Sequence, residues 1–401
     1  MTPADSCEAT PLLEPRDGIP EVINDQICEA VKILRNFSGP FAIDTERAMG
    51  IRYSNRAYLI QIKRTGSPIF LIDPVGIETK LNDLGVVLQD EWILHAADQD
   101  LPCLAELGLL PAKVFDTEIA GLLLGFERVS LQAMVAEVLN FALAKEHSSA
   151  DWSQRPIGSE MRAYAALDVD VLHELKAELV PLLENSGRLS WLEQECEEVR
   201  LRKPNPPKKQ PWRKAARQAG IRDRRALAMV EQLWQTRDEL ACKRDVAPSK
   251  VLPSKVLAEL ALRKPRSRSD VLNSSLLRSR IRMKDAPRWW DSIDRAWHLA
   301  DSELPERHFY EERDPFPPLK RWQNLDPEAA ERWTQLRAAV LTHADELGIR
   351  QDILLKPAIQ KLTAWTGWSS PTQLEDLLAE QGARPWQIEQ TAPIIFATVH
   401  N

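Results

Sequence analysis

Along the first half of the chain, short apolar runs bounded by turn residues predict strands. One run covers 39–44, a second at 58–63 alternates apolar and polar positions with period two, and a third covers 69–72. A break at 66–68 joins the second run to the third. These segments predict an antiparallel pair beside the first strand, and a further short strand is predicted at 92–94.

Helical periodicity fills the intervals between and after these strands. The predicted helices cover 81–88, 100–107, 117–124, 131–139 and 159–183. Three strands, followed by strands interleaved with helices, are typical of a mixed α/β sheet that is covered by helices.

From about residue 222 onward, strand patterns nearly vanish and helical periodicity takes over. The segment 241–261 resembles the segment 344–364, and both combine a helix end, a short turn and a second helix. This repeat predicts two small helical domains, over about 222–302 and 325–401. Ten of the thirteen Trp lie in the second half of the chain, where we expect them to anchor the cores of helical bundles.

Length and composition exclude several classes of protein. A chain of 401 residues predicts roughly two to four domains, and 44% hydrophobic with 28% charged residues is typical of globular proteins. No uncharged apolar stretch approaches the length of a membrane span, and the first 20 residues lack a signal-peptide pattern. The five Cys are widely spaced and never form a Cys-x-x-Cys pair, which favours reduced thiols in a cytoplasm over disulfides or zinc.

The formal net charge of −7 hides a strong division along the chain. Residues 1–199 contain 16 Lys and Arg against 33 Asp and Glu, residues 200–300 contain 26 against 10, and residues 301–401 contain 10 against 16. The steepest basic run, 200–225, includes a Pro-rich segment that cannot form a helix, and we interpret it as a linker. A basic linker alone is most simply a soluble spacer. Its attachment to a basic helical region favours a phosphate-binding surface.

Two pairs of residues are the first candidates for chemistry. Asp44 and Glu46 end the first predicted strand, and their spacing puts both carboxylates on one face, where like charges are costly unless a cation or a proton neutralises them. Tyr164 and Asp168 are one helical turn apart and share a face. Each pair alone has a simpler explanation, an exposed strand end for the first and ordinary packing for the second.

A third group of acids lies where the predicted strand 92–94 leads into a helix. Asp98 and Asp100 both belong to this segment, and acidic residues at a helix N-terminus are favoured by the helix dipole. Helix capping therefore accounts for either residue, and for Asp98 above all.

In combination and order, these motifs resemble the DEDD family of 3′–5′ exonucleases. The segments FAIDTERA, RAYLIQI, ILHAADQDLPCL, FDTEIAGLLLG, DWSQRP and YAALDVDVL are similar to ribonuclease D over about residues 20–190. Tyr164 indicates the tyrosine branch, because the histidine branch has His at the position of Ala163. The segment LWQTRDELACKRDVAPSKVLPSKVLAELA is similar to the HRDC module of ribonuclease D and RecQ-type helicases. The sequence has no Gly-x-x-x-x-Gly-Lys-Ser/Thr phosphate loop, which excludes a helicase.

The resemblance implies roles for five residues. Four acids would bind metal and a tyrosine would position the attacking water; these are Asp44, Glu46, Asp100, Asp168 and Tyr164. Asp100 is preferred over Asp98 because the family pattern has Asp followed by Leu. Three further residues in family-like segments are expected to be structural or supporting: His95, Asp116 and Asp151.

The implied fold is an α/β ribonuclease H-like exonuclease domain, a mixed sheet covered by helices, followed by two small all-α HRDC-type domains. The second of these is divergent, with Arg337 and Val340 where the repeat places Trp234 and Arg237. The predicted division is an N-terminal tail 1–20, the exonuclease domain 21–199, a basic Pro-rich linker 200–221, an HRDC domain 222–302, a connector 303–324 and a second HRDC-like domain 325–401.

The resemblance implies hydrolysis of RNA from the 3′ end to 5′-monophosphates by two divalent cations, Mg²⁺ or Mn²⁺. The implied partner is RNA with a free 3′ end, with tRNA precursors foremost, and no membrane partner is expected. Clustered carboxylates supply the oxygen ligands that such hard cations prefer. The alternatives are a 3′–5′ DNA exonuclease, a catalytically silent nucleic-acid-binding scaffold and a purely structural helical protein.

Overall fold

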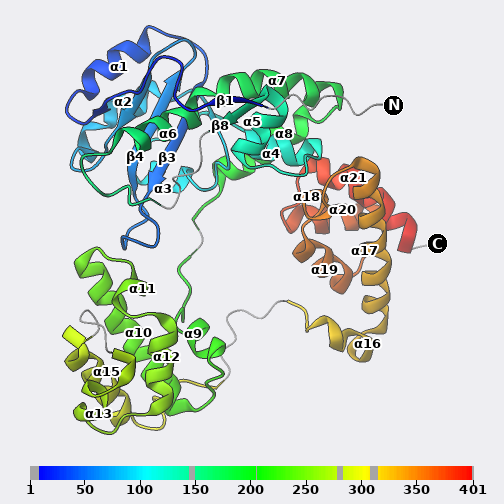
Figure 1. The fold of residues 1–401 in the computed structure, drawn as a ribbon. Coiled ribbons are helices and arrows are strands. Elements are labelled where there is room, and N and C mark those ends of the chain that lie inside the picture. The colour runs from blue at the N-terminus through cyan, green and yellow to red at the C-terminus, as the bar shows by residue number, and fades with distance from the viewer. Residues whose placement is uncertain (1–8, 144–149, 205, 278–282, 308–314, 400–401) are drawn as a thin grey trace, which may run out of the picture.

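A computed structural model describes residues 9–143, 150–204, 206–277, 283–307 and 315–399. The first 200 residues, here called the sheet domain, fold around a six-stranded sheet in the order β2-β5-β4-β3-β6-β7 (Figure 1). β3 pairs antiparallel with β4 and β4 with β5, whereas β6 and β7 extend the sheet in parallel. The strands are β1 Thr10–Leu12, β2 Val22–Ile23, β3 Phe41–Arg47, β4 Ala57–Arg64, β5 Ile69–Ile72, β6 Glu91–Leu94, β7 Lys113–Asp116 and β8 Phe141–Leu143.

The predicted mixed sheet covered by helices is confirmed, and the predicted antiparallel pair is the β4–β5 hairpin beside β3. The hydrophobic pattern did not indicate β1, β2, β7 or β8. Of these, β1, β2 and β8 are each only two or three residues long. Such short segments are too brief for an alternation of polar and apolar positions to be recognised. β1 and β8 form a separate parallel pair.

Helices cover the sheet and connect its strands. They are α1 Ile27–Arg35, α2 Asn82–Val87, α3 Leu101–Glu106, α4 Thr117–Leu124, α5 Leu131–Leu139, α6 Ser159–Asp170, α7 Leu172–Asn185 and α8 Leu189–Leu201, with a 3-10 turn at Glu78–Lys80. The single helix predicted over 159–183 is two helices, because the chain bends at Val171 between α6 and α7. α6 packs across β3, β4 and β5 and so lies directly on the sheet.

The second half consists of two helical units, and three consecutive helices of the first recur in the second at the predicted offset. α10 Arg224–Arg244, α11 Pro248–Val251 and α12 Ser254–Arg263 recur 103 residues later as α17 Pro327–Leu347, α18 Gln351–Leu354 and α19 Pro357–Thr366. Both long helices begin with an Asp that caps the helix, and both end in a left-handed residue. The weak sequence repeat therefore reflects a repeated three-helix arrangement.

The remaining helices complete the two units. They are α9 Arg213–Gln218, α13 Arg268–Leu272 and α15 Ala286–His298 in the first helical unit, and α16 Trp322–Leu325, α20 Pro371–Glu380 and α21 Pro385–Val399 in the second, with 3-10 turns at Ser275–Leu277 and Leu319–Arg321. α9 lies within the range predicted as linker but packs against α10 and α12, with Trp212 buried. Parts of the predicted tail, linker and connector lie outside the described residues.

The two helical units relate differently to the sheet domain. The second unit docks on α8, where the rings of Trp191 and Trp386 stack 4.5 Å apart and Arg384 Nε lies 2.6 Å from Glu195 Oε1. Its apolar core is continuous with that of the sheet domain, whereas the first unit has a core of its own. Among the described residues, no helix combines the length and apolar character needed to cross a membrane.

Candidate active site

The second half of β3 carries two of the predicted acids on one face of the sheet. In the antiparallel register, Asp44 lies opposite Gln61 of β4 and Glu46 lies opposite Leu59. α6 covers this part of the sheet and brings Asp168 to the same place. Carboxylate oxygens of Asp44, Glu46 and Asp168 lie within 4.8 Å of one another. Two acids of one strand and a third more than 120 residues later therefore form one cluster.

Tyr164 lies one turn before Asp168 on α6 and faces the same cluster. Burial, the neighbouring carboxylates and a hydrogen bond with Asp168 together raise the pKa of its phenol. At neutral pH, the hydroxyl of Tyr164 therefore stays protonated and can donate a hydrogen bond. The rings of Tyr164 and Trp152 lie 6.3 Å apart, so Trp152 packs beside the cluster.

Asp100 is beside the cluster but not within it. Its side chain is buried at the start of α3, where it accepts a 2.5 Å hydrogen bond from Thr45 Oγ1 and lies 3.6 Å from Arg47 Nη2. Asp98, the alternative considered from the sequence, is exposed and pairs loosely with Arg202 at 3.8 Å. Of these two acids, Asp100 is the one whose charge acts on Asp44.

Burial and mutual repulsion make the ionised cluster costly. Burial is the main cause that raises the pKa values of Asp44 and Glu46 well above their ordinary range, and the neighbouring acids add to the shift. Burial also raises the pKa of Asp100 to about 6, against the opposing effects of Thr45 and Arg47. A cation placed among these groups would favour their ionised forms.

The residues present fit a hard divalent cation. The ligand set is purely carboxylate, as Mg²⁺ and Mn²⁺ prefer, and the raised pKa values indicate a site that needs positive charge. Gln61 supports this assignment, because directly opposed residues of antiparallel strands share a face and Gln61 opposes Asp44. Its side chain is fully buried, and neither amide atom has a hydrogen-bond partner among the described residues.

The three residues expected to be supporting have local structural partners. Asp116 caps α4, and its carboxylate accepts hydrogen bonds from four backbone N–H groups, at residues 96, 97, 118 and 119. His95 Nδ1 lies 2.9 Å from Thr117 Oγ1, and burial lowers its pKa to about 4. Asp151 accepts hydrogen bonds from Ser153.

Sequence reasoning missed Thr45, Arg47 and Gln61 as neighbours of the acids. A polar Gln61 within the apolar segment LIQI was a usable signal, because a buried amide requires a polar neighbour. Thr45 and Arg47 gave no such signal, because their contacts with Asp100 depend on how the start of α3 packs against β3.

Comparison with protein families gives three matches in separate parts of the chain. Residues 22–184 match a family described as 3′–5′ exonuclease, residues 226–293 match the HRDC domain, and residues 315–399 match a family described as the 3′ to 5′ exonuclease C-terminal domain. The second helical unit, expected to be HRDC-like, thus matches a family of its own.

Individual relatives and solved structures are similar to large parts of the chain. Ribonuclease D of Zymomonas mobilis is 34% identical over 281 residues, which cover 67% of this chain and 70% of the relative. A crystal structure of a protein from Bifidobacterium adolescentis is 32% identical with a TM-score of 0.89, and covers 98% of this chain and 100% of its own. The Escherichia coli RNase D structure shares the fold, with a TM-score of 0.64, 24% identity and coverage of 90% and 98%.

Proposed function

This chain belongs to the ribonuclease D family and is a 3′–5′ exonuclease, and we propose that Asp44, Glu46, Asp168 and Asp100 form its hydrolytic centre. The observation that carries the proposal is the cluster of three carboxylates within 4.8 Å, with Tyr164 beside it. The reaction proposed is hydrolysis of the terminal phosphodiester of RNA, which releases nucleoside 5′-monophosphates from the 3′ end.

Two divalent cations bound by these four acids would supply an activated water and stabilise the leaving 3′ oxygen. The protein groups then have distinct tasks. Tyr164 stays protonated, so its hydroxyl is suited to orient the attacking water. Thr45 and Arg47 fix the carboxylate of Asp100 in place. α6 presses Asp168 and Tyr164 onto the strand that carries Asp44 and Glu46, which sets the geometry before substrate arrives.

The proposed substrates are RNAs with free 3′ ends, above all precursors of tRNA. The names of the relatives and the HRDC match support a nucleic-acid partner. The positive charge of residues 200–300 supports it as well, because this region offsets the repulsion between the acidic sheet domain and RNA. Mg²⁺ and Mn²⁺ are both compatible with the carboxylate ligands.

The substrate proposal is tested by comparing a tRNA precursor that has a 3′ trailer with a single-stranded DNA that matches the trailer, both in Mg²⁺. We expect release of nucleoside 5′-monophosphates from the RNA, arrest by EDTA and at least about a 10³-fold loss in Asp168→Asn. Asp98→Asn is the matched control, since it removes an exposed acid, and it should retain activity. Preferred degradation of the DNA would replace the RNA assignment, and an active Asp168→Asn would reject the hydrolytic centre.

A further inference from the structure

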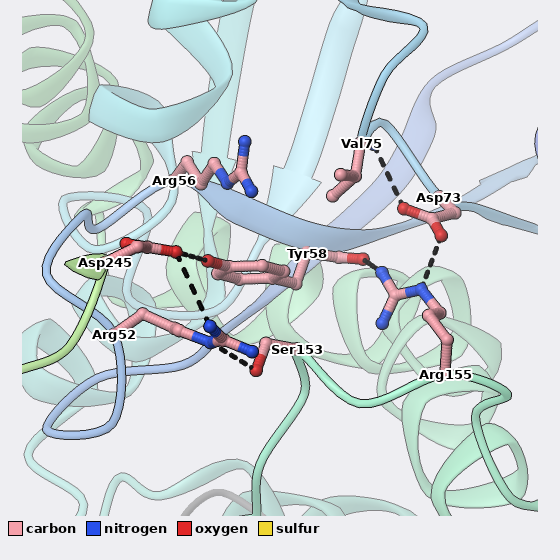
Figure 2. Close-up of a pocket in the computed structure, with 8 residues that line it drawn as sticks. All are labelled: Arg52, Arg56, Tyr58, Asp73, Val75, Ser153, Arg155 and Asp245. Atoms are coloured by element: carbon pink, nitrogen blue, oxygen red, sulfur yellow. Dashed lines mark hydrogen bonds and ion pairs between the residues drawn. The ribbon is translucent and has the colours of Figure 1, made fainter. Parts of the chain in front are cut away.

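A cavity of about 310 Å³ lies at the junction between the sheet domain and the first helical unit (Figure 2). It is lined by the loop between β3 and β4, by residues of the DWSQRP segment and by Asp245 at the end of α10. Arg52, Arg56 and Arg155 face it, together with Asp73 and Asp245. The cavity is thus a mostly polar site with one more positive than negative side chain.

The three arginines differ in how far their donors are already used. Arg155 is committed to the protein: its Nε lies 2.5 Å from Asp73 Oδ2, and Nη2 donates to the carbonyl of Tyr58 at 2.8 Å. Its Nη1 donates to two further backbone carbonyls, those of Trp152 and Gln154. Arg155 therefore holds the cavity together and has little capacity left for a ligand.

Arg56 is the opposite case. Its guanidinium lies 4.9 Å from the ring of Tyr58 and interacts with that side chain through a hydrogen bond. Among the described residues its ion pair, with Glu78, is loose at 3.8 Å. Its Nε is buried and has no hydrogen-bond partner among the described residues. A buried guanidinium N–H without an acceptor is costly, so an anionic acceptor in the cavity would be favoured.

Arg52 is intermediate between these two. Its Nε donates to Ser153 Oγ at 2.7 Å, but Nη1 lies 3.8 Å from Asp245 Oδ2, too far for a direct hydrogen bond. The side chains of Arg52 and Arg56 are 36% and 40% exposed, so an anion can reach both from solvent. Two accessible guanidinium groups beside one cavity are suited to the oxygens of a phosphate.

Two short segments of chain connect the cavity with the acidic cluster. Arg52 follows Glu46 by six residues on the loop that leaves β3. Ser153, which binds Arg52, directly follows Trp152, whose ring packs beside Tyr164 at 6.3 Å. A strand whose 3′ end lies at the acids can therefore present a phosphate further along its backbone to the cavity.

We propose that this cavity binds a backbone phosphate of the RNA, upstream of the nucleotide that is removed, with Arg56 and Arg52 as donors. The proposal rests on the proposed function and adds a binding subsite to it. Asp245, contributed by the first helical unit, weakens the site, because its carboxylate competes with the phosphate for Arg52. Such a site would recognise the charge of the phosphate and would not distinguish between bases.

The test compares a ten-nucleotide RNA with a dinucleotide too short to span both sites. Arg56→Gln should raise KM for the longer RNA about five- to tenfold at low salt and leave kcat on the dinucleotide unchanged. Loss of one phosphate contact should also flatten the plot of log affinity against log salt by about 0.7. Arg35→Gln is the matched control, since Arg35 is the exposed last residue of α1. This helix lies away from the first helical unit (Figure 1). The Arg35→Gln variant should behave like wild type.

Asp245→Asn distinguishes a phosphate-binding role of the cavity from a purely structural one. The amide can keep the contacts with Tyr53 and Tyr58 while it frees Arg52, so KM for the longer RNA should fall severalfold. A purely structural cavity would give weaker binding in both variants, and that result overturns the proposal. Arg56→Gln with a wild-type KM and salt slope overturns it too. A wild-type protein that hydrolyses neither RNA would instead reject the proposed function itself.

Discussion

At the scale of single residues, Asp100 has a charge that the fold makes costly. Its pKa of about 6 exceeds the ordinary value of 3.8, so the folded protein binds a proton that the unfolded chain releases between these values. Below about pH 4, Asp100 is protonated in the folded protein and adds its full contribution to the free energy of unfolding. That contribution is lost as the pH rises toward 6. The ionised form therefore costs about 3 kcal/mol in metal-free protein.

The cost of ionising Asp100 can be tested with Asp100→Asn, because the amide mimics the protonated acid. In EDTA, the variant should match wild type near pH 4 and be more stable by about 3 kcal/mol near pH 7. Chemical denaturation at several pH values measures the difference. Asp98→Asn, at an exposed position, should show no such trend. A pH-independent difference for Asp100→Asn would contradict the assigned pKa.

The sequence indicated which residue types form the site but not how they are held. The pairing of Asp44 with Glu46 follows from strand periodicity, whereas the expected roles of these acids and of Asp168 were implied by the resemblance to the DEDD family. The contacts of Asp100 with Thr45 and Arg47 could not be predicted, because they depend on the position of α3 relative to β3. α1 was predictable in principle, since its buried residues recur at helical spacing, at 27, 30, 31 and 34.

At the scale of elements, the two helical units use the same corner to contact the sheet domain. Asp245 caps the C-terminus of α10 with φ of 47°, and Gly348 caps the C-terminus of α17 with φ of 64°. The left-handed conformation favours Gly, yet Asp245 is tolerated there and its carboxylate contacts Tyr53, Tyr58 and Arg52. In the second unit, the Gly348 carbonyl approaches Gly125 at the end of α4.

The close approach at Gly125 gives a prediction about docking. A Cβ at this position would lie 2.2 Å from the Gly348 carbonyl oxygen, so Gly125→Ala should displace the second helical unit and lower the free energy of unfolding by about 3 kcal/mol or more. Gly76→Ala is the control, because Gly76 has nearly the same φ, 82° against 81°, and no atom within 4 Å of its added Cβ. Urea denaturation of both variants separates backbone strain from the steric clash. Equal losses in the two would contradict a tight contact.

The repeat was visible in sequence because both segments combine a helix end, a short turn and a Leu/Pro entry to the next helix. Its mode of docking was not visible. Contacts such as Arg384 with Glu195, or Trp386 with Trp191, join residues about 190 positions apart and follow from the tertiary arrangement alone.

At the scale of the whole molecule, the sheet domain and the second helical unit share a core, and the first unit stands apart with its own. A fragment of residues 210–307 should therefore fold by itself, with a helical circular dichroism spectrum and a cooperative thermal transition. A fragment of residues 315–401 should be much less stable, because it loses the contact of Trp386 with α8. Comparable cooperative transitions in both would contradict this division.

The net charge of −7 is uninformative, whereas its distribution shows an excess of acids in the sheet domain and an excess of bases in residues 200–300. Sequence alone recovered this distribution, the mixed sheet and the helical second half. It could not show that the two helical units attach differently, since apolar residues of a core and of a docking surface have the same pattern.

The central claim is that the carboxylate cluster removes nucleotides from the 3′ end of RNA. The direct measurement follows a 5′-labelled single-stranded RNA in Mg²⁺ with wild type and Asp44→Asn, with thermal unfolding recorded to show that both are folded. Wild type should shorten the labelled RNA stepwise from its 3′ end, and Asp44→Asn should do so more slowly by at least about 10³-fold. A folded Asp44→Asn that shortens the RNA at the wild-type rate would contradict the account.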